Sequence, residues 1–337
     1  MHYIVTGGSG FIGSALVKRL IKEDHQVTVL DNNSRGQLSR LDDIMDVIRF
    51  VDCDIRNVDD VINATKGADS FIHLAAVNGT ENFYKDPEKV LDIGVRGMLV
   101  AIDACRINNI KELIFSSSSE TYQKSTIVPT PEDVPLIIPD VMNARYSYGG
   151  SKIISELLAI NYGRTGFDRV MIFRPHNVYG PDMGWEHVLP QFILRAIRKI
   201  KKHPTGKVPF DILGDGMQTR AFIHIDDFIN GIMLMIENGK HLNVYNIGST
   251  EEITIKEIAY KVLGYFGREP NIITGELAPG ETVRRCPNIE KIKDIGFSQN
   301  ISFSDGLPSI IDWYKDNYYQ QRYEKNPFIN FGTSILF

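Results

Sequence analysis

The chain begins with His2-Tyr3-Ile4-Val5-Thr6-Gly7-Gly8-Ser9-Gly10-Phe11-Ile12-Gly13, a short apolar segment that leads into three glycines at three-residue spacing. Residues 14–21 follow with the apolar spacing of an amphipathic helix. Gly7 can adopt a tight turn, Gly10 lets a pyrophosphate approach the main chain, and Gly13 lets the helix pack closely on the strand. The helix start offers unpaired N–H groups to an anion. This strand, turn and helix therefore predict a dinucleotide site.

A second buried strand is predicted over residues 26–30, and it ends in Asp31, at the distance beyond the glycines that the dinucleotide motif requires. A carboxylate there can accept both ribose hydroxyls of adenosine and would repel a 2′-phosphate. We therefore expect NAD rather than NADP, with Asn32 beside Asp31 in the site. Arg35 could neutralise a phosphate, but we interpret it as a solvated loop residue.

Composition excludes several classes of partner. The net charge of −5 offers no polycationic face, so nucleic acid is not expected. No apolar run is long enough for a membrane span and no signal peptide precedes the first strand, so we expect no membrane contact. The three cysteines (Cys53, Cys105 and Cys286) are scattered without metal-ligand spacing, which favours buried thiols, no metal site and a cytoplasmic location.

Strand and helix patterns continue to alternate. Strands are predicted over residues 47–51, 70–76 and 111–115, and a long helical pattern covers residues 87–108. The rhythm predicts an α/β fold: a Rossmann-type doubly wound parallel sheet with ligands at the carboxyl ends of its strands.

Residues after two of these strands are candidate cofactor contacts. Asp54 and Ile55 follow the third strand, where Asp54 could meet the adenine amino group or cap the helix that starts near Asn57. Leu74, Ala75 and Ala76 complete the fourth predicted strand, and small side chains there leave room for a cofactor.

The predicted domain boundary falls after residue 173. Residues 1–173 form the NAD-binding domain, including a proline-rich irregular loop over 124–145. Residues 174–322 form a smaller C-terminal α/β substrate-binding lobe that is interleaved with the first domain. Its predicted strands are 210–213 and 244–247, and its helices lie near 187–200, 226–237 and 254–266. Residues 323–337 are an aromatic-rich tail without an assigned role.

Tyr148 and Lys152 are the main catalytic candidates, because their spacing places them on one face of a helix. The ammonium group and the positive nicotinamide of oxidised NAD would favour the tyrosine phenolate and lower its pKa. Such a phenolate can take a proton from a sugar hydroxyl while hydride leaves the same carbon. Ser118, at the end of a neighbouring strand, could hydrogen-bond the same oxygen. The alternative is a surface pair of side chains.

Taken together, these motifs resemble the extended short-chain dehydrogenases/reductases of the nucleotide-sugar epimerase/dehydratase group, over nearly all of residues 1–320. The matching segments are Thr6-Gly7-Gly8-Ser9-Gly10-Phe11-Ile12-Gly13, Asp31, Asp54-Ile55-Arg56, His73-Leu74-Ala75-Ala76, Ser116-Ser117-Ser118, Tyr148 with Lys152, Arg174-Pro175-His176-Asn177-Val178-Tyr179-Gly180-Pro181, and Gly214-Asp215-Gly216-Met217-Gln218-Thr219-Arg220.

The resemblance implies tightly held NAD, a nucleoside-diphosphate sugar as substrate and a homodimer that pairs through helices over 87–108 and 149–163. It adds Ser116 and Pro175 to the cofactor contacts. Asn177 and Arg220 would hold the substrate diphosphate, with Arg284 or Arg285 as a second arginine, since guanidinium groups suit phosphate oxygens. Val188 and Leu189 fall where such enzymes wrap the nucleoside base, and Ser118 and Ser119 would face the sugar.

The resemblance leaves the reaction open, and Glu120 is the reason. A 4-epimerase oxidises the sugar at C4, turns the ketone over and returns the hydride, and it needs no further acid or base. In 4,6-dehydratases and glucuronate decarboxylases, a glutamate at the position of Glu120 takes a further part. Dehydratases often carry aspartate and threonine where this chain has Ser119 and Ser118, and Glu120 could simply be hydrogen-bonded to loop backbone.

Residues 174–177 and 184–187 also resemble 3,5-epimerases acting on GDP-mannose, but the acid/base cysteine of those enzymes is replaced by Ser118 or Ser119. The hypothesis we favour is a 4-epimerase. The alternatives are a dehydratase or decarboxylase that uses Glu120, a net-turnover dehydrogenase, and a non-catalytic NAD-binding regulatory protein. The nucleotide base and the sugar stay open.

Overall fold

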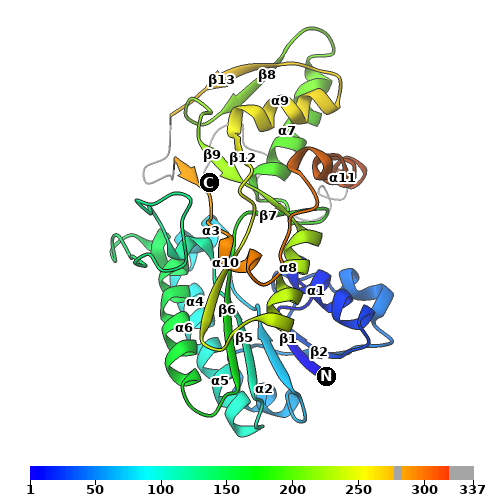
Figure 1. Cartoon of the computed structure of the whole chain (residues 1–337). Coiled ribbons are helices and arrows are strands. Elements are labelled where there is room, and N and C mark those ends of the chain that lie inside the picture. The colour runs from blue at the N-terminus through cyan, green and yellow to red at the C-terminus, as the bar shows by residue number, and fades with distance from the viewer. Residues whose placement is uncertain (277–282, 319–337) are drawn as a thin grey trace.

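The computed structural model describes residues 1–276 and 283–318, and its centre is a seven-stranded sheet in the order β11-β6-β5-β4-β1-β2-β3 (Figure 1). All six neighbouring pairs are parallel. The order reverses between β1 and β4, which confirms the predicted doubly wound Rossmann-type fold. Its strands are β1 (His2–Thr6), β2 (Gln26–Asp31), β3 (Arg49–Asp52), β4 (Ser70–His73), β5 (Glu112–Ser116), β6 (Arg169–Pro175) and β11 (Asn243–Ile247).

Helices cover both faces of this sheet, so its central strands are buried on both sides; β5 is buried at every position. On one face α1 (Phe11–Lys22) packs against α8 (Ile225–Asn238). The other face carries α2 (Val58–Ala64), α5 (Gly97–Ile107) and α6 (Ser147–Gly163), as Figure 1 shows. The predicted helix over 87–108 is built from α4 (Pro87–Leu91), a π-helical turn η2 (Asp92–Arg96) and α5.

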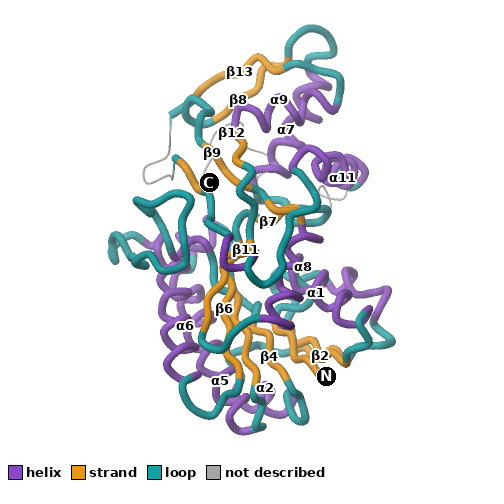
Figure 2. The backbone as a smooth tube through the Cα atoms, in the orientation of Figure 1, coloured by secondary structure: helices purple, strands orange, loops and turns teal. Residues whose placement is uncertain are grey.

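A smaller lobe lies beyond the carboxyl ends of the sheet strands, at the top of Figures 1 and 2. A separate apolar core between its helices and its small sheets, which have the strand orders β10-β7, β12-β9-β14 and β13-β8, holds it together. Its elements, with the short α10 that packs back against β11, are β7 (Val178–Tyr179), α7 (Val188–Lys202), β8 (Val208–Ile212), β9 (Thr219–Ala221), β10 (Ile223–His224), β12 (Glu252–Thr254), α9 (Ile255–Tyr265), β13 (Pro270–Thr274), β14 (Arg284–Arg285), α10 (Glu290–Lys293) and α11 (Phe303–Asp316).

Short elements lie in the connections that follow β2, β4 and β5: η1 (Leu38–Ile44), α3 (Thr80–Lys85), η3 (Ser119–Thr121) and η4 (Ala144–Tyr146). The loop over 124–145 is irregular, as predicted, up to the start of η4. Two expectations need correction. The fourth strand ends at His73 rather than Ala76, and the strand predicted at 244–247 is β11 of the central sheet, which gains a strand from the C-terminal half.

The boundary between residues 173 and 174 stays a prediction, and the tail over 323–337 lies outside the described residues. In the part of the chain that the structure describes, no helix combines the length and apolar character needed to cross a bilayer.

Candidate active site

The glycine-rich turn after β1 has the shape that a dinucleotide requires. Gly7 has a φ of +71°, and a Cβ at Gly13 would lie 2.1 Å from the Gly7 carbonyl oxygen. Gly10 is the N-cap of α1 and supplies no side-chain cap, so the helix start keeps N–H groups available to an anion. Phe11 and Ile12 begin the helix. These residues fit a pyrophosphate, and NAD bound here would supply a hydride acceptor and donor.

Asp31 ends β2 beside this turn. Its two carboxylate oxygens accept the backbone N–H groups of Ser9 (3.0 Å) and Asn33 (2.9 Å), which fix its orientation. Asn32 is exposed, and its side chain accepts the N–H of Ser34 at 3.1 Å. Arg35, which we interpreted as a solvated loop residue, lies 3.5 Å from Glu186 of the lobe and is partly exposed.

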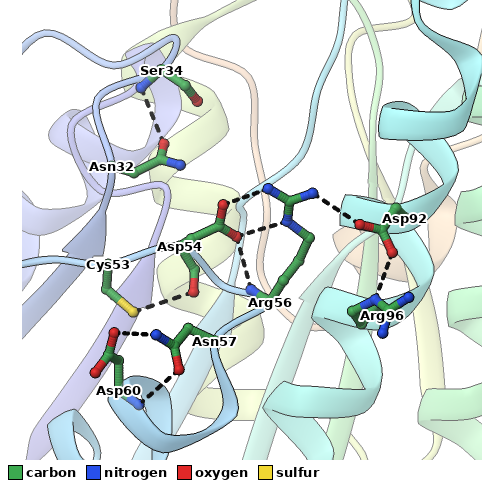
Figure 3. A network of polar contacts seen from close by, with 9 residues as sticks. All are labelled: Asn32, Ser34, Cys53, Asp54, Arg56, Asn57, Asp60, Asp92 and Arg96. Carbon is green, nitrogen blue, oxygen red and sulfur yellow. Dashed lines mark hydrogen bonds and ion pairs between the residues drawn. The ribbon is translucent and has the colours of Figure 1, made fainter.

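Asp54 is held by an arginine rather than by a helix end (Figure 3). Its carboxylate accepts the Nε of Arg56 at 2.9 Å and the Nη2 at 2.7 Å, and Arg56 also reaches Asp92 of η2 at 2.9 Å. The hydrogen bonds from Arg56 lower the pKa of Asp54. The N-cap of α2 is Asn57, so the capping alternative for Asp54 is wrong. Ile55, next to Asp54, is buried.

The residues after β4 are positioned by Thr6. Its hydroxyl oxygen accepts the N–H groups of Leu74 (3.1 Å) and Ala75 (3.2 Å) and is 2.9 Å from Nδ1 of His73. Burial lowers the pKa of His73 to about 3, so that ring is neutral and structural. Leu74, Ala75 and Ala76 remain partly accessible at the strand end, as a cofactor contact requires. Pro175 ends β6 beside Ile247.

The structure brings the predicted catalytic side chains together. Lys152 donates from Nζ to the Ser116 carbonyl oxygen at 2.7 Å, which ties α6 to the end of β5. Ser118 follows two residues later, and its hydroxyl oxygen accepts the N–H of Glu120 at 3.1 Å while its side chain lies close enough to Tyr148 to lower the pKa of that hydroxyl. The Phe83 ring stacks on Tyr148 with 5.1 Å between centroids and 9° between planes. The Tyr148 ring is therefore held by packing, and Ser118 lies close to its hydroxyl.

Burial dominates the protonation of this pair. It raises the pKa of Tyr148 to about 12, against the lowering effect of Ser118, and it lowers the pKa of Lys152 to about 7. Lys152 Nζ lies 5.7 Å from the Tyr148 ring centroid. Without a dinucleotide, Tyr148 is protonated at neutral pH. The expected lowering of its pKa therefore stays a prediction for the NAD-bound protein, where the nicotinamide adds positive charge.

Glu120 forms an ion pair. Its Oε1 lies 2.5 Å from Nη1 of Arg285, and that guanidinium lowers the pKa of Glu120, helped by Arg145 and Arg220. The carboxylate is therefore ionised and paired with an arginine, instead of bonded to loop backbone as one alternative held. Arg145 is a residue that sequence reasoning missed, although its place just before Tyr148 was a signal.

The two candidate arginines of β14 point to different partners. Arg284 forms a bidentate pair with Glu252 and is half-exposed, whereas Arg285 is mostly buried against Glu120. Arg220 on β9 pairs in register with Arg285. Asn177 has a φ of +38° and donates to the Ala221 carbonyl oxygen at 2.9 Å. Of the two, Arg285 is thus the one that lies beside Arg220 and Glu120.

The remaining substrate candidates differ in accessibility. Val188 is half-buried at the start of α7, while the Leu189 side chain is fully buried in the lobe core. Leu189 can therefore contact a nucleoside base only through its main chain. Ser119 is buried in η3 and lines a small pocket with His176 and Arg285.

A buried ion pair beneath the site also escaped sequence reasoning. Arg174 on β6 donates to both carboxylate oxygens of Glu156 on α6, at 2.8 and 2.6 Å, and both side chains are almost fully buried. Ser117 adds a third hydrogen bond to Glu156. The sequence signal that could have revealed this ion pair was the presence of two opposite charges, Arg174 and Glu156, within a strand and a helix expected to be apolar. The pair fixes α6, and hence Tyr148, relative to the strand ends.

Comparisons with known proteins agree with this geometry. The model of the NAD-dependent epimerase/dehydratase family matches residues 3–248. A trifunctional UDP-glucose 4,6-dehydratase/epimerase/reductase of Arabidopsis thaliana is 29% identical over 329 residues (94% of this chain), but the chain spans only 47% of its length. A UDP-N-acetyl-α-D-glucosaminuronate decarboxylase of Bacillus cytotoxicus is 28% identical and matches over 93% of this chain and 97% of its own.

Two solved structures superimpose over almost the whole chain. The dTDP-glucose 4,6-dehydratase DesIV of Streptomyces venezuelae, solved with NAD bound, gives a TM-score of 0.84 at 28% identity and covers 95% of this chain and 98% of its own. The UDP-glucose 4-epimerase of Thermotoga maritima, solved with UDP-glucose, gives 0.83 at 25% identity and covers 94% and 100%. These proteins share a fold and differ in reaction.

Proposed function

The chain belongs to the NAD-dependent epimerase/dehydratase family, and we propose that within it the protein is a nucleotide-sugar 4-epimerase. The observation that supports this reaction is that the carboxylate of Glu120 is ionised and already paired. Glu120 is paired with Arg285 at 2.5 Å, and its pKa is lowered by that guanidinium. Tyr148, with Ser118 and Lys152, is then the acid/base group of the site.

A 4-epimerase needs only that group. Tyr148 takes the proton from the C4 hydroxyl as the C4 hydrogen leaves as hydride, and it returns the proton when hydride reaches the other face of the C4 ketone. Ser118, which lies close to the Tyr148 hydroxyl, can hydrogen-bond the same sugar oxygen. Lys152 fixes the strand end through Ser116 and favours the phenolate when it is charged. Each proton that leaves the sugar is returned, so no net change of mass occurs.

A 4,6-dehydratase needs two further groups: a base for the C5 proton and an acid that protonates the departing C6 hydroxyl. The position next to Glu120, where dehydratases often carry an aspartate, is Ser119 in this chain, and a serine hydroxyl is a poor acid. Glu120 itself is held ionised. An ionised Glu120 could still accept the C5 proton, although its lowered pKa makes it a weak base. A dehydratase would also need an acid, which Ser119 does not supply; the decarboxylase alternative, too, depends on Glu120.

We assign the substrate diphosphate to Arg220, Arg285 and Asn177. Arg220 and Arg285 are register partners on β9 and β14, and both lie near Glu120. Two guanidinium groups on one small sheet can bind the oxygens of both phosphates. The relatives named above act on UDP- and dTDP-sugars, which supports a nucleoside-diphosphate hexose as the substrate.

The test is the mass of the product formed from a panel of UDP-, dTDP-, GDP- and CDP-hexoses and hexuronic acids without added NAD. We expect a product of unchanged mass that is the 4-epimer, turnover reduced at least about 100-fold in Tyr148→Phe, and retained turnover in Glu120→Gln. Tyr162→Phe is the matched control, since Tyr162 lies on the same helix about 21 Å along its axis from Tyr148. Loss of water or carbon dioxide would overturn the proposal.

We also infer that two copies pair through the helices predicted for this purpose. Leu91 on α4 and Ile154 and Leu157 on α6 are exposed apolar side chains, and α4 and α6 pack side by side. Covering this face would remove apolar surface from water.

A further inference from the structure

The segment that follows Asp31 is fastened to the glycine-rich turn at a single buried residue, Ser9. The Ser9 N–H donates to Asp31 at 3.0 Å, its hydroxyl donates to the Asn33 side chain at 2.8 Å, and its carbonyl accepts the N–H of Gln37 at 3.0 Å. Gly36 packs so closely that a Cβ there would lie 1.8 Å from the Ser9 hydroxyl oxygen. Segment 31–40 therefore lies directly against the turn that fits the pyrophosphate.

Arg40 extends this attachment to the substrate lobe. Its Nη1 donates to the Ser9 carbonyl oxygen at 3.2 Å. Its Nε and Nη2 donate to the two carboxylate oxygens of Asp182, at 2.6 and 2.9 Å, and Nη2 also donates to the Asp182 carbonyl oxygen at 3.0 Å. The Arg40 side chain is only 10% exposed and that of Asp182 24%. Bidentate geometry away from water makes this pair stronger than a surface ion pair.

Asp182 is itself firmly held. It follows β7 with a φ of +59°, a conformation that a non-glycine residue adopts only where its surroundings impose it. Met183 next to it is buried, and the hydroxyl of Tyr314 on α11 donates to the Gly184 carbonyl oxygen. Tyr314 is fully buried in the lobe core. The Arg40–Asp182 pair therefore connects the glycine-rich turn to a rigid anchor in the other half of the molecule.

We propose that Arg40 and Asp182 are positioning residues for the dinucleotide: their ion pair fastens segment 31–40 across the glycine-rich turn to the substrate lobe and so keeps NAD bound between turnovers. Asp31, the expected ribose ligand, lies at the start of the fastened segment. Release of NAD requires this segment to detach, and loss of the pair raises the fraction of molecules in which it is detached. This proposal depends on NAD binding and is independent of the 4-epimerase assignment.

The experiment measures NAD release from the full-length holoprotein. Protein loaded with radiolabelled NAD is mixed with excess unlabelled NAD, and the label that stays bound is followed with time. We expect Arg40→Ala and Asp182→Asn each to increase the release rate at least about ten-fold, and the double variant to increase it no more than the larger single change, because both remove one interaction.

Asp43→Asn is the matched control. It breaks the ion pair between Lys18 on α1 and Asp43 on η1, three residues from Arg40. Both side chains of this pair are exposed, so the NAD release rate of the variant should stay within about two-fold of wild type. Release rates in Arg40→Ala and Asp182→Asn equal to that control would overturn the proposal, as would effects that simply multiply in the double variant. Asp182→Asn keeps the side-chain shape and decides the question if Arg40→Ala does not fold.

The melting temperature of the NAD-free variants distinguishes a pair that retains NAD from a pair that only stabilises the fold. If the pair only stabilises the fold, melting temperature falls while the NAD release rate of the folded variants stays at the wild-type value. That result would also overturn the proposal.

Discussion

Replacing Lys152 by methionine should make the NAD-free protein more stable at pH 6 and less stable near pH 10. Lys152 is almost fully buried in α6, where its ammonium group donates to the Ser116 carbonyl oxygen at 2.7 Å and lies 4.8 Å from the Phe115 ring centroid. Burial lowers its pKa from 10.5 to about 7. Between these values the unfolded chain binds a proton that the folded chain does not, so wild-type stability rises with pH through this window.

The magnitude follows from that difference. The pKa of Lys152 falls from 10.5 in the unfolded chain to about 7 in the folded protein, and each pKa unit corresponds to about 1.36 kcal/mol. At pH values below 7 the charged lysine therefore lowers the free energy of unfolding by up to about 5 kcal/mol. Methionine removes this cost and leaves the Ser116 carbonyl without its partner, which costs about 1–2 kcal/mol. The net gain at pH 6 is about 3 kcal/mol. With an unfolding entropy of about 0.7 kcal/mol/K for 337 residues, the melting temperature should rise by about 4 °C.

The assay is thermal unfolding of NAD-free wild type and Lys152→Met, followed by circular dichroism at pH 6, 7.5 and 9. The difference in melting temperature should shrink steadily as the pH rises and change sign at higher pH, where the wild-type lysine is neutral in the folded protein. Lys66→Met is the control, because Lys66 is exposed and its replacement should give a small difference that does not vary over this range. A constant difference for Lys152→Met, or a variant that is less stable at pH 6, would refute the reasoning.

Two further substitutions test the interactions that support the site. Glu156→Gln should lower the free energy of unfolding by about 3–5 kcal/mol, measured by urea denaturation, because it leaves the buried Arg174 guanidinium without its counter-charge; a loss below about 1 kcal/mol would contradict this. Gly13→Ala should abolish retention of NAD by the purified protein, since the new Cβ would meet the Gly7 carbonyl oxygen at 2.1 Å. Gly264→Ala, on α9 with nothing within 4 Å of its Cβ, should keep NAD and gain about 0.5–1 kcal/mol of stability, and equal NAD content in both alanine variants would show that the turn tolerates a side chain.

Local sequence patterns were sufficient for the fold class and for the geometry of the glycine-rich turn. The strand, the three glycines and the helix over residues 2–21 are consecutive, and the steric demands at Gly7 and Gly13 arise within that segment or at the neighbouring strand. The place of Asp31 at a strand end and the shared helix face of Tyr148 and Lys152 could also be predicted from the sequence, because side chains repeat with a fixed period along strands and helices. The proximity of Tyr148, Ser118 and Lys152 was accessible to sequence reasoning for that reason, whereas their catalytic roles stay a prediction.

Other features could not be predicted because they depend on contacts between distant segments. These are the strand that residues 243–247 add to the sheet, the partners of the charged side chains and the role of Glu120. Glu120 meets Arg285, Glu156 meets Arg174 and Arg40 meets Asp182 only once the lobe has packed on the carboxyl edge of the sheet. The pKa of Lys152 was equally hidden, since burial by the tertiary structure and not the neighbouring sequence sets it. The sequence by itself determined the local geometry of the glycine-rich turn, because hydrogen bonding and side-chain period act over a few residues. Tertiary structure decided which charges are paired and buried, because desolvation and Coulomb attraction depend on position in space and not on position in the chain.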